Sequence, residues 1–193
     1  SNLDAKLRDS MRHEIRRICK EAKLTAVYVT HDRQEALSMA DRIAIIHQGR
    51  LEQIGNPETL YLHPVTRFTA GFMGQVNFFP ATVADVNAES CRIDTPWGKL
   101  QAAPPAFPVV PGQRCSAMVR PESFRIDTPT EAVNRIDALL VGGTFLGETS
   151  MWECAAAEIT LKVTELCPHR REAGQKITLT VAPDRIVLLP EDN

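Results

Sequence analysis

The sequence predicts an α/β segment over residues 1–73 followed by an all-β domain over residues 74–193. Up to Gly74, apolar residues recur either at helical spacings of three and four or in short β-branched runs. After Gly74, short alternating runs are separated by Pro and Gly turns, which is typical of a small β barrel or sandwich. An eight-residue pattern in this second part recurs after 62 residues, which indicates two related halves.

The overall composition excludes several classes of protein. The 22 basic and 24 acidic side chains give a formal net charge of −2, so there is no basic excess of the kind that nucleic acid or an anionic membrane selects. The five cysteines are odd in number and form no CxxC pair, which argues against a disulfide framework and a zinc site and suits a reducing cytoplasm. No apolar run approaches the roughly 20 residues of a membrane span, and no signal peptide is recognisable. We expect a soluble protein that binds no metal.

A long amphipathic helix is predicted at the start of the chain. Its apolar residues follow one another at spacings of four and three, which places them on a single stripe over about five turns. The five Arg and Lys residues from Arg8 to Lys20 lie off this stripe, and we interpret them as a solvated face rather than a nucleic-acid surface. The stripe consists of Leu3, Leu7, Met11, Ile15, Ile18 and Ala22.

Residues 24–50 are predicted to form a strand, a polar turn, a helix and a second strand. Residues 25–30 are a β-branched and aromatic run of the kind that forms a buried strand, and His31 and Asp32 follow where the run ends. Ligands bind at the carboxyl ends of strands in open α/β sheets, so the imidazole is a candidate functional group, and Asp32 can cap the helix. From its chemistry alone, a single histidine here is more often a capping or surface residue.

The end of the first segment is predicted to be a hairpin followed by two short helices. Residues 43–46 and 51–54 form the hairpin, and Gly49 in its turn can take a positive φ. Asn56 followed by proline predicts a helix start. A second helix is predicted over residues 65–73, and we place the domain boundary at the glycine that follows it.

Two stretches of the first segment resemble the nucleotide-binding domain of ABC transporter ATPases, in the subfamily that energises binding-protein-dependent importers. The run VTHDRQEALSMADRIAIIHQGRLEQIGNPETLY resembles the end of that domain, and SNLDAKLR at the start resembles its D-loop. The resemblance implies that His31 is the switch histidine that contacts the γ-phosphate of ATP. It also implies that Asp4 crosses the interface between two ATPase subunits, so both residues are expected near bound ATP.

The repeat gives the second segment its predicted architecture. Residues 112–119 match residues 174–181, and each copy is followed by a proline turn and a strand. Because each half is too small to bury a core alone, the two are expected to share one. Residues 75–193 resemble the OB-like regulatory region of the same transporter subfamily, the TOBE domain. The expected fold is therefore the α/β remnant of a P-loop ATPase domain followed by an OB-like β barrel made of two repeats.

Arg120, Pro121 and Glu122 resemble the RPE turn that is characteristic of TOBE domains. The resemblance makes these residues candidates for a regulatory ligand site. From their chemistry alone, Arg120 and Glu122 more often form a structural turn held by an ion pair than a ligand site. Ala182 takes the place of Arg120 in the second copy, so we do not expect a symmetric pair of sites.

Sequence motifs that hold nucleotide phosphates are absent from these 193 residues. Nothing fits GxxxxGK[ST], and no LSGGQ-like signature is present. The resemblance thus implies a C-terminal fragment of the ATP-binding subunit of an ABC importer, in which ATP hydrolysis by the full-length parent drives solute import. ATP and Mg²⁺ are expected cofactors of that parent. The fragment itself is expected to bind no cofactor and to be inactive.

The resemblance also implies partners at the cytoplasmic face of the inner membrane. These are a second copy of the chain, transmembrane permease subunits and, through the permease, an extracytoplasmic solute-binding protein. The transported solute stays open, since polyamine, ferric iron, phosphonate and sugar importers share these motifs. We also expect the fragment to dimerise, because the strands that flank residues 25–30 in the family are missing here.

Two other classes of function remain open at this stage. The paired repeat favours a stand-alone ligand-binding, regulatory and dimerisation module. An OB-type nucleic-acid binder would need aromatic and basic residues interleaved on its strands. The scattered aromatics and the nearly neutral charge argue against the nucleic-acid binder.

Overall fold

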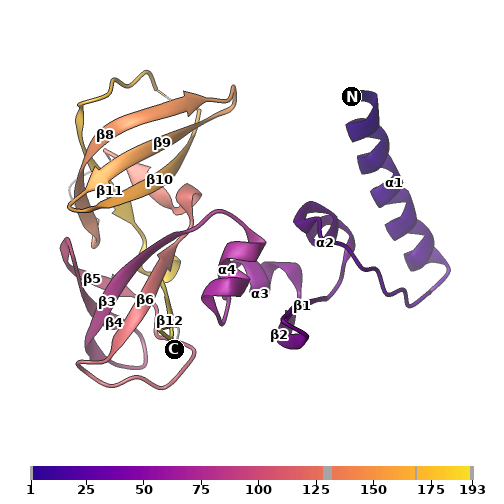
Figure 1. Ribbon diagram of the computed structural model, residues 1–193, viewed down its shortest axis with the longest axis horizontal. Helices are drawn as coiled ribbons and strands as arrows, with labels where there is room; N and C mark the ends of the chain where they lie inside the picture. Colours follow the sequence, from indigo (N-terminus) through magenta and orange to yellow (C-terminus); the bar gives the residue numbers. More distant parts are fainter. Residues whose placement is uncertain (1, 128–131, 168, 192–193) are drawn as a thin grey trace. The chain divides into compact units, whose positions relative to one another are not determined.

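The computed structural model describes residues 2–127, 132–167 and 169–191, and at residues 2–6, 8 and 9 it describes the backbone alone. The chain divides into two compact units, Ser1–Gly74 and Gln75–Asn193, which Figure 1 colours from indigo to yellow along the sequence. None of the helices in the described part of the chain combines the length and the apolar character that a bilayer crossing needs.

The first unit is mostly helical, and its helices begin at polar caps. Asp32, Asn56 and Thr66 each accept a hydrogen bond from a backbone N–H in the first turn of the helix that follows. Gln48 and Gly49 have positive φ values of 49° and 75°, as a two-residue hairpin turn requires. The elements are α1 (Asn2–Glu21), α2 (Arg33–Met39), β1 (Ile43–His47), β2 (Arg50–Gly55), α3 (Pro57–Leu62) and α4 (Arg67–Met73).

A small core joins the hairpin to α3 and α4. Ile43 and Ile45 of β1 are buried together with one residue from each of these helices, Leu60 and Met73. His47 stacks on Phe68 with 3.6 Å between ring centroids and 13° between ring planes. The predicted hairpin and both short helices are therefore present, and α4 begins two residues later than expected.

The predicted strand over residues 25–30 is wrong, because no strand forms there. Val27 and Val29 are each 91% exposed. A strand needs a neighbour to pair its backbone N–H and C=O groups, and the only strands described in this unit pair with each other. No residue of β2 is buried either.

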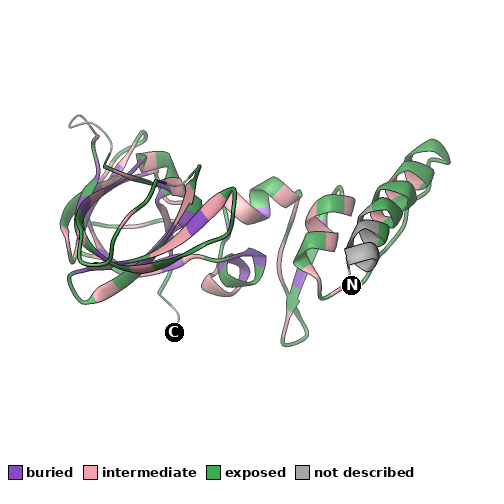
Figure 2. Ribbon diagram, turned by 90° about the horizontal axis from the view of Figure 1, so that it is seen from above, coloured by how far each residue is buried: buried purple, intermediate pink, exposed green. Residues whose placement is uncertain are grey.

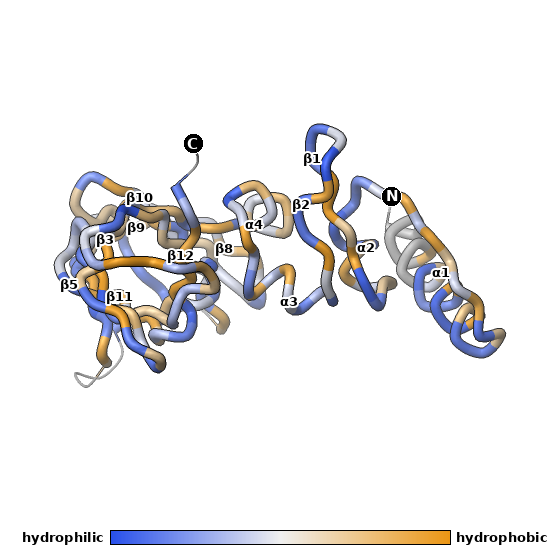
Figure 3. Tube along the Cα trace, turned by 90° about the horizontal axis from the view of Figure 1, so that it is seen from below, coloured by the Kyte–Doolittle hydropathy of each residue, from blue (hydrophilic) through white to orange (hydrophobic). Residues whose placement is uncertain are grey.

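The predicted helix over the first residues is present as α1, but its two faces are used in the opposite way to that expected. Leu7 and Met11 of the apolar stripe are 57% and 54% exposed, and Figure 3 shows hydrophobic positions along α1 and the segment after it. Arg12, Arg16 and Lys20 instead form ion pairs with residues of α2 and its flanks. The interpretation of these cations as a solvated face holds for Arg17 and Lys20, which are exposed, but not for Arg12, whose side chain is only 13% exposed.

The second unit is built from antiparallel strands and has the predicted two-repeat architecture. Buried residues line the inside of its curled sheets (Figure 2). The first repeat contains β3 (Asn77–Val86), β4 (Cys91–Thr95), β5 (Gly98–Ala102), β6 (Arg114–Val119), the 3₁₀ turn η1 (Pro121–Ser123) and β7 (Phe124–Ile126). The second contains β8 (Arg135–Phe145), β9 (Thr149–Ala156), β10 (Ile159–Leu166), β11 (Lys176–Val181), η2 (Pro183–Arg185) and β12 (Val187–Leu189).

Each repeat completes the sheet of the other with its last strand. The strand orders are β5-β4-β3-β6-β12 and β10-β9-β8-β11-β7. Phe124 of β7 pairs with Val181 of β11, and Val187 of β12 pairs with Met118 of β6. Neither repeat therefore holds a complete five-stranded sheet of its own, which the 62-residue periodicity did not reveal.

Two buried asparagines join the sheets at equivalent places in the two repeats. Asn134 accepts a hydrogen bond from the Gln101 amide (2.7 Å) and donates to the Gln101 carbonyl (2.8 Å) and to the carbonyl at the end of β11 (3.1 Å). Asn77 makes the same three contacts, with Lys162 (2.7 and 2.8 Å) and with the carbonyl at the end of β6 (3.3 Å). Both asparagines thus pair the free backbone groups of an edge strand, β5 or β10, from the opposite sheet.

Replacing Asn134 with alanine should destabilise the second unit by about 3 kcal/mol. The change removes three hydrogen bonds and leaves buried backbone groups of β5 and β11 unpaired. Urea unfolding followed by tryptophan fluorescence measures this, because Trp97 and Trp152 both lie in the second unit. Gln101→Ala is the matched control, since Asn134 contacts only the backbone of Gln101. Equal stability of both variants would contradict the role assigned to Asn134.

Candidate functional site

His31 lies in the turn that leads into α2, with fixed backbone on both sides. The Asp32 amide donates to Thr30 Oγ1 (2.9 Å), and Asp32 Oδ1 accepts from the Gln34 amide (2.7 Å). The imidazole itself is exposed. Since residues 25–30 form no strand, the expectation that His31 sits at the carboxyl end of a strand is not met in this structure.

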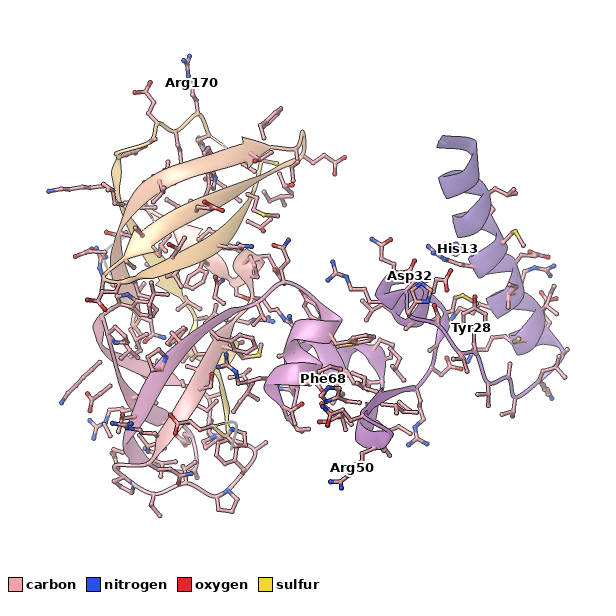
Figure 4. All side chains as sticks on the ribbon, viewed as in Figure 1. His13, Tyr28, Asp32, Arg50, Phe68 and Arg170 are labelled. Atoms are coloured by element: carbon pink, nitrogen blue, oxygen red, sulfur yellow. The ribbon has the colours of Figure 1, made fainter. Side chains whose placement is uncertain are left out.

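Glu35 is the centre of the hydrogen-bond network beneath this turn. Its Oε2 accepts from Thr30 Oγ1 at 2.7 Å and from the Tyr28 hydroxyl at 3.2 Å. Its Oε1 accepts from Arg12 Nη2 at 3.2 Å, and the same nitrogen lies 3.3 Å from Asp32 Oδ2. Tyr28 and Asp32 accordingly lie next to α1 in Figure 4.

The electrostatics of the cluster keep its carboxylates ionised. The hydrogen bond from Thr30, followed by that from Arg12, holds the pKa of Glu35 below its ordinary value. The backbone amide of Gln34 does the same for the pKa of Asp32. The negative charge of Glu35 in turn raises the pKa of the Tyr28 hydroxyl, which stays a neutral donor.

A second group of ion pairs holds α1 against the end of α2. Arg16 Nη2 lies 3.1 Å from Asp41 Oδ1, and Lys20 Nζ lies 2.8 Å from Asp41 Oδ2. Arg16 also donates to the carbonyl of Met39. With Arg12, these cations are spaced four residues apart and therefore line one face of α1. Asp41 is well exposed, so each of these pairs contributes little by itself.

The expected role of Asp4 is not tested by the described residues. Asp4 belongs to α1, and its side chain lies outside the described residues. Among the residues whose side chains are described, no His, Cys, Asp and Glu groups cluster in a way that could hold a metal ion. The described site therefore consists of an exposed imidazole on a turn held by Thr30, Asp32 and Glu35.

The RPE turn of the second unit is placed differently from an open ligand site. Arg120 is only 3% exposed, and its Nη1 donates to the carbonyl of Gln75 at 3.0 Å. Pro121 is buried and Glu122 is exposed on η1. This geometry favours the structural interpretation of the turn, in which Arg120 holds the first residue of the second unit.

The network around Glu35 was not predicted from the sequence, although one signal for it is present. Asp32 and Glu35 are three residues apart at a helix start, which is the spacing of a capping box. In a capping box the glutamate would return to the backbone N–H of the cap residue. Here Thr30 accepts that N–H, and the carboxylate of Glu35 binds Thr30, Tyr28 and Arg12 instead.

The relatives that match both the segment with this histidine turn and the two-repeat β domain are ATP-binding subunits of ABC importers. The chain belongs to this family. It is 39% identical to the spermidine/putrescine import ATP-binding protein PotA of Thermobifida fusca, in an alignment of 200 positions that covers 97% of the chain. It is 33% identical to the Fe(3+) ions import ATP-binding protein FbpC of Photorhabdus laumondii, in an alignment of 195 positions that covers the whole chain.

A PotA of Pseudomonas aeruginosa is 46% identical to the chain over 127 residues, which are 65% of the chain and 35% of that relative. The chain covers 50% of the Thermobifida protein and 53% of the Photorhabdus protein. It thus spans between about a third and about a half of the length of these relatives.

Family models and solved structures give no further information on function. No protein-family model matches the chain. The solved structure of the cytoplasmic molybdate-binding protein ModG is similar at a TM-score of 0.48 and 17% identity, over 58% of this chain and 94% of that one. A likeness at this level carries no inference about function.

Acid should loosen the contact between α1 and α2. Because the folded-state pKa values of Glu35, Asp32 and Asp41 are lowered, the unfolded state binds more protons, and the stabilisation is present above about pH 4.5 and lost as the pH falls through the lowered values. Hydrogen-exchange protection factors of α2 amides should therefore fall between about pH 6 and pH 3. Arg12→Ala should lower protection at pH 6 and reduce this pH dependence. Equal protection at both pH values would contradict the prediction.

Proposed function

We propose that the full-length protein carrying this chain is the ATP-binding, energy-coupling subunit of an ABC importer. In this proposal, residues 1–73 are the C-terminal portion of its ATPase domain and residues 74–193 are a TOBE-like regulatory domain. The relatives named above support the proposal, because they match the chain over both units and are themselves import ATP-binding proteins.

The observation that carries the proposal is the uncovered apolar surface of the first unit. Ile15 and Ile18 of α1 are 41% and 47% exposed, and Val27 and Val29 are almost fully exposed. Apolar side chains at this density are normally covered by more protein. In the full-length protein, strands on either side of residues 25–30 would pair this backbone and bury both faces of the segment.

Pairing of that segment would also explain the position of His31. The histidine would then follow a strand at its carboxyl end, where ligands of α/β sheets bind. Its imidazole is exposed, so it can donate a hydrogen bond to the γ-phosphate of ATP as negative charge develops there. The phosphate-cradling loop and the carboxylates that hold Mg²⁺ would come from other parts of the full-length chain.

The remaining partners follow from the same proposal. Two copies of the subunit close on ATP, with Asp4 reaching across their interface, and the difference in affinity between closed and open states drives the permease subunits. A solute-binding protein delivers the solute to the permease from the other side of the membrane. The subunit itself lies at the cytoplasmic face. Polyamines and ferric iron are the candidate solutes, because the similar proteins are named for spermidine/putrescine and Fe(3+) import.

A second candidate function is a stand-alone regulatory module formed by the second unit. One core is shared by both repeats, and each repeat completes the other, so this unit has what independent folding needs. A ligand of this module would raise its melting temperature. The uncovered surface of the first unit has no explanation in this alternative, which is why the ATPase-subunit proposal is preferred.

The central test is His31→Ala in the full-length protein assembled with its permease. Loss of a hydrogen bond that strengthens in the transition state should lower kcat for ATP hydrolysis by about 10²–10³-fold. His63→Ala is the matched control, because His63 ends α3 and is not part of the turn that carries His31. A His31→Ala protein with the wild-type rate would refute the assigned role.

The chain by itself should associate through its uncovered apolar surface. Light scattering should give a mass that rises with concentration above that of the 21.4 kDa monomer. Val29→Lys should weaken this association, since Val29 is 91% exposed and its replacement costs no packing in the monomer. Val110→Lys, in an exposed loop of the second unit, is the control. A constant monomer mass at all concentrations would show that the surface does not drive self-association.

A further inference from the structure

The carboxylate of Glu35 connects every element that borders the His31 turn. It accepts from Thr30, the residue before His31, and from Tyr28 farther back along the same segment. It also accepts from Arg12 of α1, which reaches Asp32, the residue after His31. Arg12 and Glu35 have side chains that are only 13% and 22% exposed, so this network is partly withdrawn from water.

The hydrogen bonds form a chain that ends on the backbone next to His31. The Asp32 amide donates to Thr30 Oγ1, and the Thr30 hydroxyl donates its own proton to Glu35 Oε2. Because a hydroxyl has a single proton, its donation to Glu35 leaves a lone pair of Oγ1 directed at the Asp32 amide. The orientation of Thr30, and with it the turn at His31, therefore depends on the carboxylate.

We propose that Glu35 is a positioning residue for His31, and that it fixes the direction of the imidazole through Thr30 and Arg12. The inference rests on the proposed function of His31 as the γ-phosphate contact. A group that acts on a phosphoryl transition state has to be held to within about 0.5 Å, and a turn on a short helix supplies this only when its neighbours are locked. The imidazole is exposed, so the hydrogen-bond network around Glu35 has to lock the turn that carries it.

Glu35→Gln is the informative variant, because glutamine has nearly the same size. Its single carbonyl oxygen replaces two charged acceptors that now serve Thr30, Tyr28 and Arg12, and its amide adds donors where donors already converge. Thr30→Val tests the same chain of hydrogen bonds at its middle, because it removes the hydroxyl and keeps the shape. Glu14→Gln is the matched control, since Glu14 pairs with Arg17 on the exposed side of α1.

The first measurement uses the chain as it is and does not depend on ATP. Amide hydrogen exchange, read by NMR, should show the Asp32 amide exchanging at least about tenfold faster in Glu35→Gln and in Thr30→Val, as the loss of a charge-assisted hydrogen bond implies. Glu14→Gln should exchange like the wild type. Unchanged exchange at Asp32 in both test variants would overturn the inference, whatever the function of the protein.

The second measurement uses ATP hydrolysis by the full-length protein with its permease. Glu35→Gln should lower kcat by about tenfold and leave KM for ATP unchanged, because the hydrogen bond from His31 strengthens only as charge develops in the transition state. The double variant with His31→Ala should be no slower than His31→Ala alone, since Glu35 acts only through the histidine. Multiplicative losses in the double variant would overturn the positioning role. A wild-type rate for His31→Ala would refute the proposed function itself. The exchange measurement would still decide whether Glu35 holds the turn at His31, because it does not depend on ATP.

Discussion

The pairing of backbone N–H and C=O groups on strand edges is the constraint on which both units depend. In the second unit each repeat sends its last strand into the sheet of the other, so every five-stranded sheet contains chain from both repeats. Asn77 and Asn134 then pair the edge strands β10 and β5 from across the sheets. Because each repeat pairs backbone groups of the other, loss of one sheet would leave backbone groups of the other sheet unpaired. The unit therefore has one cooperative core instead of two.

The same constraint is not satisfied in part of the first unit. Residues 25–30 have the side chains of a buried strand but no strand beside them, so their backbone stays unpaired and Val27 and Val29 face solvent. Leu7, Met11, Ile15 and Ile18 of α1 are also exposed. What holds α1 in place is charge: Arg12, Arg16 and Lys20 meet acceptors on and around α2. Charge pairs at exposed sites are weak, so this is the less stable part of the molecule.

The turn at His31, the proposed contact to the γ-phosphate, is held by hydrogen bonds among its own neighbours. The Asp32 carboxylate accepts a hydrogen bond from the first turn of α2, and the Thr30 hydroxyl accepts one from the Asp32 amide. Glu35 in turn accepts from the Thr30 hydroxyl and so orients it. Each of these side chains is occupied, while the imidazole between them stays exposed. In the RPE turn the central side chain is not exposed. Arg120 is buried, and its guanidinium donates a hydrogen bond to the carbonyl of Gln75. The two motifs that resemblance singles out thus differ in whether their central side chain is accessible.

Local patterns were sufficient for much of this protein. Caps at Asp32 and Asn56 and the hairpin turn at Gly49 depend on neighbouring residues alone, and the 62-residue repeat is a likeness between two stretches of sequence, so each was readable from the sequence. The exchange of β7 and β12, the asparagine contacts and the network of Glu35 join residues far apart in the chain, so only the tertiary structure decided them. Residues 25–30 show the boundary between the two: side chains give the preference for a strand, but a strand exists only where another backbone accepts and donates its hydrogen bonds.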